Sequence, residues 1–211
     1  LANDEEGGLD IALLEDVQQL RRVGGMRAVI EGDGEDHLVG AKGRDSLYGG
    51  AGNDLVQGEE GDDRFVLSSG FGNDTLVGGE TSETTGDVLD ATALTTGVTL
   101  TLTAPENGTL TDGTYTAGIS QIEVFRLGAG NDTINGSTGA DSLDAGAGND
   151  LVLGENGNDI ARGGPDLDLV NGGRGGRMPA FQNALTPDEI AAVVEAWVTV
   201  ALVTMASARG R

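Results

Sequence analysis

The chain has 211 residues, of which 37% are hydrophobic and 3% aromatic, so a large conventional hydrophobic core is not expected. It carries 35 acidic and 12 basic residues, and the resulting formal net charge of -23 disfavours nucleic acid and anionic membrane surfaces as partners and favours cations. The 37 glycines are more than twice the usual share of about 7%, and the absence of cysteine excludes disulfides, zinc–thiolate sites and a thiol nucleophile.

Residues 1–30 precede any repeat and contain the stretch LDIALLEDVQQLRRVGG. Its spacing predicts a helix that ends at Gly24 and carries four aliphatic side chains on one face. These are Leu9, Leu13, Val17 and Leu20. We expect this helix and a lead-in strand to cover the open end of the structure that follows. A linker from an upstream domain is the alternative.

Residues 31–90 repeat a glycine-rich unit of nine residues. From Glu31 the chain reads EGDGEDHLV, GAKGRDSLY, GGAGNDLVQ and GEEGDDRFV, and after two extra residues it continues as SGFGNDTLV. A sixth, degenerate unit begins as GGE, is interrupted by TSET and ends as TGDVLD. Position six of each unit is Asp: Asp36, Asp45, Asp54, Asp63, Asp74 and Asp87. Position eight is apolar: Leu38, Leu47, Val56, Phe65, Leu76 and Leu89.

Residues 91–126 lose this period and alternate between apolar and polar residues, as in VTLTLT and ISQIEVFRL. The alternation predicts strands, and the intervening PENGT predicts a turn at Asn107-Gly108. We interpret this segment as a β-rich insertion in one continuous repeat structure, with a separate ligand module as the alternative.

Residues 127–177 resume the period as LGAGNDTIN, GSTGADSLD, AGAGNDLVL, GENGNDIAR and GGPDLDLVN. Position six is again Asp throughout: Asp132, Asp141, Asp150, Asp159 and Asp168. A flexible linker has no physical reason to hold Asp and an apolar residue in fixed phase over ten clear units. The repeats are therefore predicted to be folded.

Residues 178–211 contain a helix start at Thr186-Pro187-Asp188-Glu189, followed by the apolar run IAAVVEAWVTVALVTMASA. Glu195 lies inside this run and would cost about 2.5–3.5 kcal/mol near the centre of a bilayer. We expect a helix that packs on the repeats or on another protein or surface component and contributes to an export signal. Membrane contact through residues 190–208 is the alternative.

The repeated unit matches the pattern G-G-x-G-x-D-x-U-x, in which U is a large aliphatic residue. With it, the chain from residue 31 to about residue 172 resembles the repeats-in-toxin (RTX) family, the hemolysin-type calcium-binding repeats of secreted bacterial proteins. The resemblance implies an all-β fold, a parallel β-roll (right-handed β-solenoid) of glycine-rich nonapeptide repeats with short flanking N- and C-terminal helices. In such a roll, two consecutive units make one coil.

The resemblance also implies several bound Ca2+ ions, held by the position-six carboxylates and by carbonyl oxygens of the glycine turns, an all-oxygen set that suits this cation. The implied carboxylate pairs are Asp36 with Asp54, Asp45 with Asp63, Asp54 with Asp74, Asp63 with Asp87, Asp132 with Asp150, Asp141 with Asp159, and Asp150 with Asp168. The implied turn glycines are Gly32, Gly34, Gly43, Gly50, Gly52, Gly61, Gly70, Gly72, Gly128, Gly130, Gly139, Gly146, Gly148 and Gly157. Lys42 and Arg44 place positive charge in one turn, and Asp166 replaces the position-four glycine of the last unit, so weaker sites are expected there.

The function implied is that of a calcium-binding module of a secreted or cell-surface bacterial protein, exported by a type I route and folding when Ca2+ binds, with a structural or interaction role. One alternative is the non-catalytic C-terminal part of a larger secreted protease, lipase or epimerase. Another is an accessory subunit docked to a membrane complex through its C-terminal helix. No HExxH or GxSxG motif is present, and the single histidine, His37, is expected at a solvated outward position, so no catalytic residue and no enzyme activity are predicted.

Overall fold

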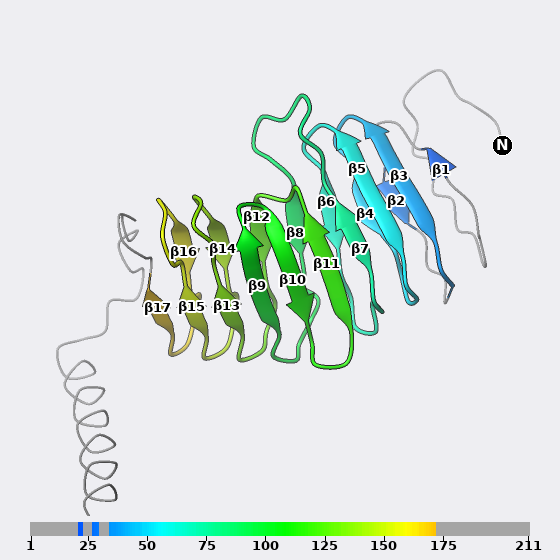
Figure 1. Ribbon diagram of the computed structural model, residues 1–211. Helices are drawn as coiled ribbons and strands as arrows, with labels where there is room; N and C mark the ends of the chain where they lie inside the picture. The colour runs from blue at the N-terminus through cyan, green and yellow to red at the C-terminus, as the bar shows by residue number, and fades with distance from the viewer. Residues whose placement is uncertain (1–20, 23–26, 30–33, 172–211) are drawn as a thin grey trace, which may run out of the picture. The chain divides into compact units, whose positions relative to one another are not determined.

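The structure is a computed structural model that describes residues 21–22, 27–29 and 34–171. The chain divides into two compact units, Leu1–Pro179 and Ala180–Arg211, and the second lies wholly outside the described residues. Within the described part every regular element is a strand, and the strands form two sheets (Figure 1). This confirms the predicted all-β parallel β-roll.

The first sheet has ten strands. In sheet order they are β1 (Arg21–Arg22), β3 (His37–Lys42), β5 (Leu55–Glu60), β7 (Thr75–Val77), β11 (Thr116–Ser120), β10 (Asn107–Thr111), β9 (Thr99–Ala104), β13 (Thr133–Asn135), β15 (Leu151–Leu153) and β17 (Leu169–Asn171). The second sheet has seven: β16 (Ile160–Arg162), β14 (Ser142–Asp144), β12 (Val124–Arg126), β8 (Val88–Asp90), β6 (Arg64–Val66), β4 (Ser46–Tyr48) and β2 (Arg27–Val29).

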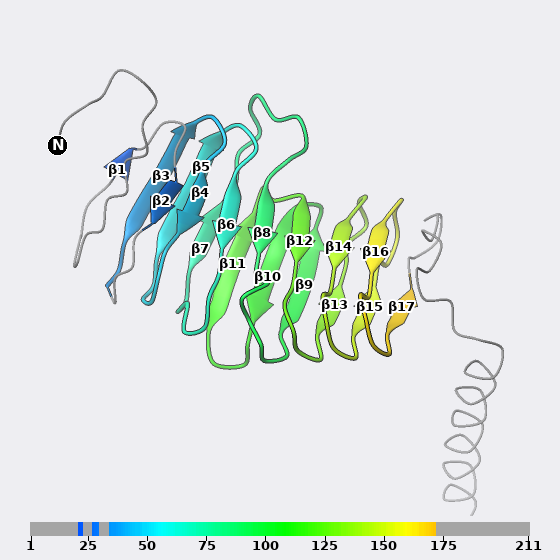
Figure 2. The same cartoon turned by 180° about the vertical axis from the view of Figure 1, so that it is seen from behind.

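Successive repeat units place their strands alternately in the first and the second sheet, so two units make one coil (Figure 2). Residues 18 apart are therefore register partners in parallel strands, as Leu38 is with Val56 and Leu143 is with Ala161. Extra residues lengthen this spacing without changing the register, because Val56 pairs with Leu76. The insertions bulge out between strands while the strands keep their alignment.

The segment between the repeat blocks adds a three-stranded meander to the first sheet. β10 runs antiparallel to both β9 and β11, while β11 pairs parallel with β7 and β9 pairs parallel with β13. The predicted turn at Asn107-Gly108 is wrong, because both residues lie in β10 and the turn is at Pro105-Glu106. Pro105 is suited to open a tight turn, and the Asn107 side chain closes this one by donating to the Pro105 carbonyl at 2.6 Å.

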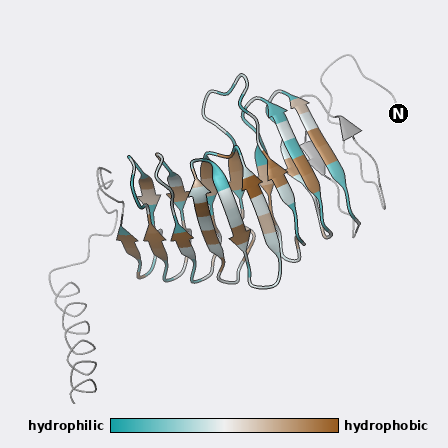
Figure 3. Cartoon of the chain, in the orientation of Figure 1, coloured by the Kyte–Doolittle hydropathy of each residue, from teal (hydrophilic) through white to brown (hydrophobic). Residues whose placement is uncertain are grey.

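The position-eight side chains of the repeats, together with Leu100 and Phe125 of the inserted segment, line the core between the two sheets. Leu38, Val56, Leu76, Leu100, Ile134 and Val152 are buried on the first sheet, and Leu47, Phe65, Leu89, Phe125, Leu143 and Ala161 are buried on the second. Figure 3 shows hydrophobic segments recurring on neighbouring strands, as this stacking requires. Each fully buried Leu or Phe stabilises the fold by about 1.5–3 kcal/mol. The core is therefore built from apolar side chains that both sheets contribute and that stack from coil to coil.

Turn glycines allow the coils to approach closely. A Cβ atom on Gly72 would lie 1.4 Å from the carbonyl oxygen of Gly52, one coil earlier, and one on Gly52 would lie 1.8 Å from that of Gly34. Only glycine fits where two backbones meet at this distance. The glycines of position four thus set the spacing of the turns.

The predicted flanking helices fall mostly outside the described residues. Of the N-terminal one, only Arg21 and Arg22 are described, and they form β1 and pair with β3 instead of continuing a helix to Gly24. The predicted C-terminal helix and the alternative membrane contact through residues 190–208 lie outside the described residues. In the part of the chain that the structure describes, no helix is long and apolar enough to cross a membrane.

Candidate metal centre

The position-six Asp residues connect neighbouring coils. Each Asp stands at the end of a turn, directly before its strand, and in most coils its Oδ1 accepts a hydrogen bond from the backbone N–H of the Asp one coil earlier. All seven predicted pairs are joined in this way, with N···O distances of 2.6–3.1 Å. The carboxylates therefore form ladders along the turns, as the 18-residue spacing predicted.

The second carboxylate oxygen of most ladder residues is buried without a hydrogen-bond partner. This holds for Oδ2 of Asp54, Asp63, Asp87, Asp132, Asp150 and Asp159. These six residues are only 0–3% exposed. A buried carboxylate oxygen without a donor is unfavourable, and none of these six residues takes part in an ion pair with the described residues. The structure thus leaves a row of acceptors that a cation would satisfy.

Burial raises the pKa of several ladder carboxylates. The pKa of Asp63 is raised to about 6 and that of Asp74 to about 7, in both cases mainly by desolvation, with repulsion from the preceding Asp as a further cause. Asp132 is raised to about 6 by desolvation and by the charge of Asp150. Without a cation, ionising these groups at neutral pH therefore opposes folding. A bound cation would remove that penalty.

A cation at the ladders would need further ligands, and the backbone offers them. Among the described residues, no group of three or more His, Cys, Asp or Glu side chains is gathered tightly enough to hold a metal ion. The carbonyl oxygens of Gly34 and Gly130 instead point toward the glycines stacked on them, Gly52 and Gly148, where a Cβ would come within 1.8 Å. Two carboxylates and turn carbonyls make an all-oxygen donor set, which fits Ca2+.

The predicted site residues occupy two ladders, one beside each sheet. Beside the first sheet the ladder runs through Asp36, Asp54 and Asp74, and again through Asp132, Asp150 and Asp168. The inserted meander separates these two halves. Asp132 accepts a hydrogen bond from the N–H of Val98, and Val98 has no carboxylate that could continue the ladder toward Asp74. Beside the second sheet the ladder joins Asp45, Asp63 and Asp87, and separately Asp141 and Asp159. Gly32 lies outside the described residues, and the other predicted glycines lie in the turns between strands.

One ladder residue was missed by the sequence analysis. Glu123 precedes Val124 and Phe125, and Phe125 pairs with the position-eight residues Leu89 and Leu143. Glu123 therefore occupies position six, and its carboxylate accepts the Asp87 N–H at 2.5 Å. The signal was present, because Glu123 stands 18 residues before Asp141, but Glu in place of Asp hid it.

Asp141 differs from the other ladder residues. Its Oδ2 accepts the Ser137 N–H at 2.7 Å and its Oδ1 lies 3.1 Å from the Ser137 hydroxyl. Ser137 occupies position two of its unit, where the repeat pattern has glycine. Ser137 therefore satisfies both carboxylate oxygens of Asp141 locally, which leaves this carboxylate less available to a cation than the other predicted ligands of the second block.

Two other predictions concern polar residues of the first block. Lys42 pairs with Glu60 in the next coil, Nζ to Oε2 2.9 Å, so its charge is partly compensated at the turn where a weaker site was expected. His37 was predicted at an outward, solvated position, and it is partly exposed but also has a side-chain partner. Its ring Nε2 lies 2.7 Å from Oε1 of Gln57 in the neighbouring strand, and the side chain is half-buried.

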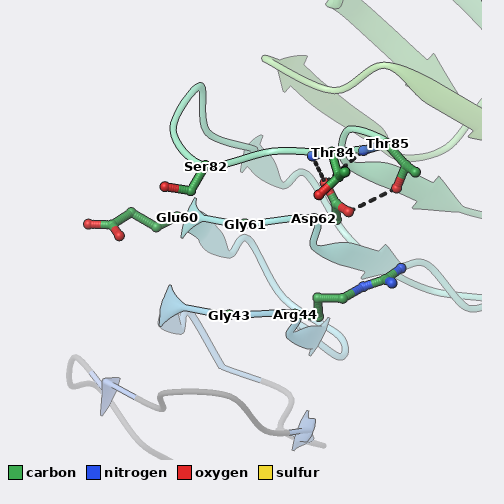
Figure 4. Close-up of a pocket in the computed structure, with 8 residues that line it drawn as sticks. All are labelled: Gly43, Arg44, Glu60, Gly61, Asp62, Ser82, Thr84 and Thr85. Atoms are coloured by element: carbon green, nitrogen blue, oxygen red, sulfur yellow. Dashed lines mark hydrogen bonds between the residues drawn. The ribbon is translucent and has the colours of Figure 1, made fainter.

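A cleft of about 400 Å3 lies beside Asp62, next to the TSET insertion (Figure 4). The Asp62 carboxylate accepts the N–H groups of Thr84 and Thr85 at 2.7 and 3.0 Å, together with the Thr85 hydroxyl. These hydrogen bonds lower the pKa of Asp62 to about 2. Asp62 therefore anchors the inserted loop and differs from most ladder carboxylates, whose Oδ2 atoms have no hydrogen-bond donor.

The comparisons agree with this geometry. A family model described as the RTX calcium-binding nonapeptide repeat matches four copies, at residues 32–65, 66–81, 126–161 and 149–176. That model describes a calcium-binding repeat and not a catalytic domain. No curated protein and no solved structure matches the chain. The family is typically found in secreted bacterial proteins, and its nonapeptide repeats bind Ca2+ ions. Carboxylate ladders beside stacked glycine turns, together with this match, show that the chain belongs to the family of RTX calcium-binding nonapeptide repeats.

Proposed function

We propose that the chain is a calcium-triggered folding module of a secreted or cell-surface protein, with a structural or interaction role. The observation that carries this proposal is the set of buried Oδ2 atoms without hydrogen-bond partners. Desolvation, with repulsion from neighbouring carboxylates as a further cause, raises the pKa of Asp63 to about 6 and that of Asp87 to about 8. The roll is thus weakened by its own ligands until a cation binds.

The ions would be held by the seven Asp pairs already described, together with carbonyl oxygens of the stacked glycine turns. Binding of Ca2+ to the folded roll alone would add stability that depends on the ratio of free Ca2+ to Kd. Extracellular calcium modules have Kd values of roughly 0.1–1 mM. At a free Ca2+ concentration about ten times Kd, each site would contribute about 1.4 kcal/mol. Several sites acting together would decide whether the roll folds.

This coupling suits a protein that crosses a cell envelope. In a calcium-poor cytosol the repeats would stay unfolded and would be competent for export, whereas outside the cell millimolar Ca2+ would fold them. The presence of the repeats in secreted bacterial proteins of this family supports this interpretation. Type I export and the role of residues 178–211 as part of an export signal remain predictions from the sequence.

Far-UV circular dichroism during a Ca2+ titration tests the proposal, with Mg2+ as the control ion. We expect a cooperative gain of β signal in Ca2+ and little in Mg2+. Asp54→Asn removes a ladder charge and should shift the midpoint to higher Ca2+. Asp144→Asn is the matched control, because Asp144 lies on strand β14 outside the turns with its side chain 40% exposed. A chain that is fully folded in chelator and unaffected by Ca2+ would refute the proposal.

A further inference from the structure

Position five of the repeat, directly before each ladder Asp, carries a second set of hydrogen bonds between coils. The Asn53 side chain accepts the backbone N–H of Asn73, one coil later, on its Oδ1 at 3.0 Å. Asn131 accepts the N–H of Asn149 at 3.0 Å in the same way, and Asn149 accepts that of Leu167 at 3.1 Å. In each case the donor is the residue directly before a ladder Asp.

These bonds run in the opposite direction to those of the Asp ladder. The Asp54 N–H donates to the Asp74 carboxylate of the next coil at 3.0 Å, and the Asn73 N–H of that coil donates back to Asn53. Two adjacent residues of one coil are thus joined to two adjacent residues of the next by a reciprocal pair of hydrogen bonds, which we term the turn clamp. The same clamp joins residues 131–132 to 149–150 and residues 149–150 to 167–168.

Asp62 completes a similar clamp with a carboxylate in place of an amide. Its Oδ1 accepts the Gly86 N–H at 3.2 Å. Gly86 directly precedes Asp87, whose own Oδ1 accepts the Asp63 N–H at 2.6 Å. The clamp therefore requires an oxygen acceptor of suitable length at position five, and either Asn or Asp supplies it.

The other Asp pairs lack the clamp in the described structure. These are Asp36 with Asp54, Asp45 with Asp63, and Asp141 with Asp159, each joined by the ladder hydrogen bond alone. The residues at position five of their earlier coils are Glu35, Arg44 and Ala140. Alanine has no side-chain acceptor and arginine carries only donors, while glutamate is one methylene longer than the residues that form the clamp. The residue type at one position thus divides the pairs into clamped and unclamped ones.

We infer that the turn clamp sets how long a Ca2+ ion stays at a ladder, so that clamped Asp pairs release their ions more slowly than unclamped pairs. The clamp fixes the backbone directly before the ligand Asp, and ligands that are held in place beforehand lose less freedom when an ion binds. Differences in affinity between related sites lie mainly in the rate of dissociation. The inference rests on the proposed calcium dependence of the roll.

The clamp residues are positioning residues, because their side-chain oxygens are directed at backbone N–H groups of the next coil. They are Asn53, Asp62, Asn131 and Asn149. The competing explanation is that Asn stands in these turns only because it favours turn conformations. Asn156 separates the two explanations. It is also an exposed Asn of a glycine turn, but it lies at position three and its side chain has no hydrogen-bond partner among the described residues.

Stopped-flow mixing of the Ca2+-loaded full chain with a fluorescent chelator measures the release of the ions, and circular dichroism confirms that each variant is folded at saturating Ca2+. Asn131→Ala removes one clamp acceptor. We expect it to speed one release phase by about three- to tenfold, the effect of one hydrogen bond, and to leave the other phases unchanged. Asn131→Asp keeps an acceptor, as Asp62 does, and should restore slow release. Asn156→Ala is the matched control and should leave every phase unchanged.

Glu35→Asn and Glu35→Gln provide a second, matched pair of variants at an unclamped Asp pair. Both remove the same exposed charge, but only Asn has the length of the residues that form the clamp. We expect one phase to be about three- to tenfold slower in Glu35→Asn than in Glu35→Gln, because the new amide accepts the Asn53 N–H. Equal rates in these two variants would overturn the inference even if Asn131→Ala fails to fold.

The outcomes for Asn131→Ala separate positioning from general stability. Acceleration of all phases together would show that Asn131 only stabilises the fold, and unchanged phases would show that the clamp does not act on the ions; either result would overturn the inference. A change in Asn156→Ala equal to that in Asn131→Ala would do the same, because turn propensity would then account for both. If the unmodified chain binds no Ca2+ at all, the proposed function itself fails.

Discussion

Gly70→Ala and Gly72→Ala form a matched pair that tests how closely the turns are stacked. Both glycines belong to the unit SGFGNDTLV and have similar positive φ values, 81° and 88°. A non-glycine residue in this region costs about 1–2 kcal/mol. A Cβ on Gly70 would meet nothing within 4 Å, so Gly70→Ala should lower the free energy of unfolding by only that amount.

Gly72→Ala adds a collision with backbone. Its Cβ would lie 1.4 Å from the Gly52 oxygen, whereas ordinary contacts begin near 3.4 Å, so the two turns must separate by about 2 Å. That movement breaks two hydrogen bonds, from Thr75 N–H to the Asp54 carbonyl at 2.7 Å and from Asp54 N–H to the Asp74 carboxylate at 3.0 Å. Their net loss is worth about 2–4 kcal/mol, since one of them involves a charged acceptor.

The total expected for Gly72→Ala is therefore about 3–6 kcal/mol, against about 1–2 kcal/mol for Gly70→Ala. Urea unfolding of both variants and the unmodified chain, at the same saturating Ca2+, measures the difference. Equal m-values would show that the same surface unfolds in each. If the two variants lose the same stability, the close stacking of position-four glycines does not hold the coils together.

Three further predictions concern protons, the core and one turn. Because the pKa values of Asp74 and Asp87 are raised to about 7 and about 8, folding of the calcium-free chain should become less unfavourable as pH falls from 8 toward 5, with a gain of β signal in circular dichroism in chelator; a loss of β signal over this range would contradict the sign. Phe125→Ala should cost about 3–5 kcal/mol in urea unfolding at saturating Ca2+, because Phe125 is 1% exposed in the core, and a loss below about 1 kcal/mol would place it outside that core. Ser137→Gly restores the glycine of the repeat and removes the hydroxyl that bonds Asp141, so calorimetry should show tighter Ca2+ binding, and weaker binding would show that the serine assists the site.

The nine-residue period predicted most of the fold. The apolar residues at position eight predicted the core, because residues 18 apart lie on neighbouring strands of one sheet and their side chains stack on one another. Position six fixed the ladders for the same reason, and all seven Asp pairs lie in adjacent coils. The extra residues after Val66 and the TSET insertion did not disturb the pairing, since loops absorb them outside the sheets.

The pairing of the inserted segment with the two repeat blocks could not be predicted from the sequence. The period is lost between residues 91 and 126, so nothing in the pattern indicated that β11 would join β7 or that β9 would join β13. The turn was placed at Asn107-Gly108 because that dipeptide favours hairpins, but the bulge between these two residues lies within β10. Glu123 was missed because its role depends on the pairing of Phe125 with two distant strands. Such tertiary contacts decide which carboxylates share a turn.

Hydrogen–deuterium exchange of the repeat strands is the measurement that tests the central claim most directly. The amides of β5 and β15, one strand from each repeat block, would be followed at neutral pH in chelator, in millimolar Mg2+ and in millimolar Ca2+. The account predicts rapid exchange in chelator and in Mg2+, and strong protection of both strands together in Ca2+, because cations at the turns neutralise the carboxylate ladders that join the coils. Equal protection of both strands in chelator and in Ca2+ would contradict it, since the roll would then be stable without metal at its turns.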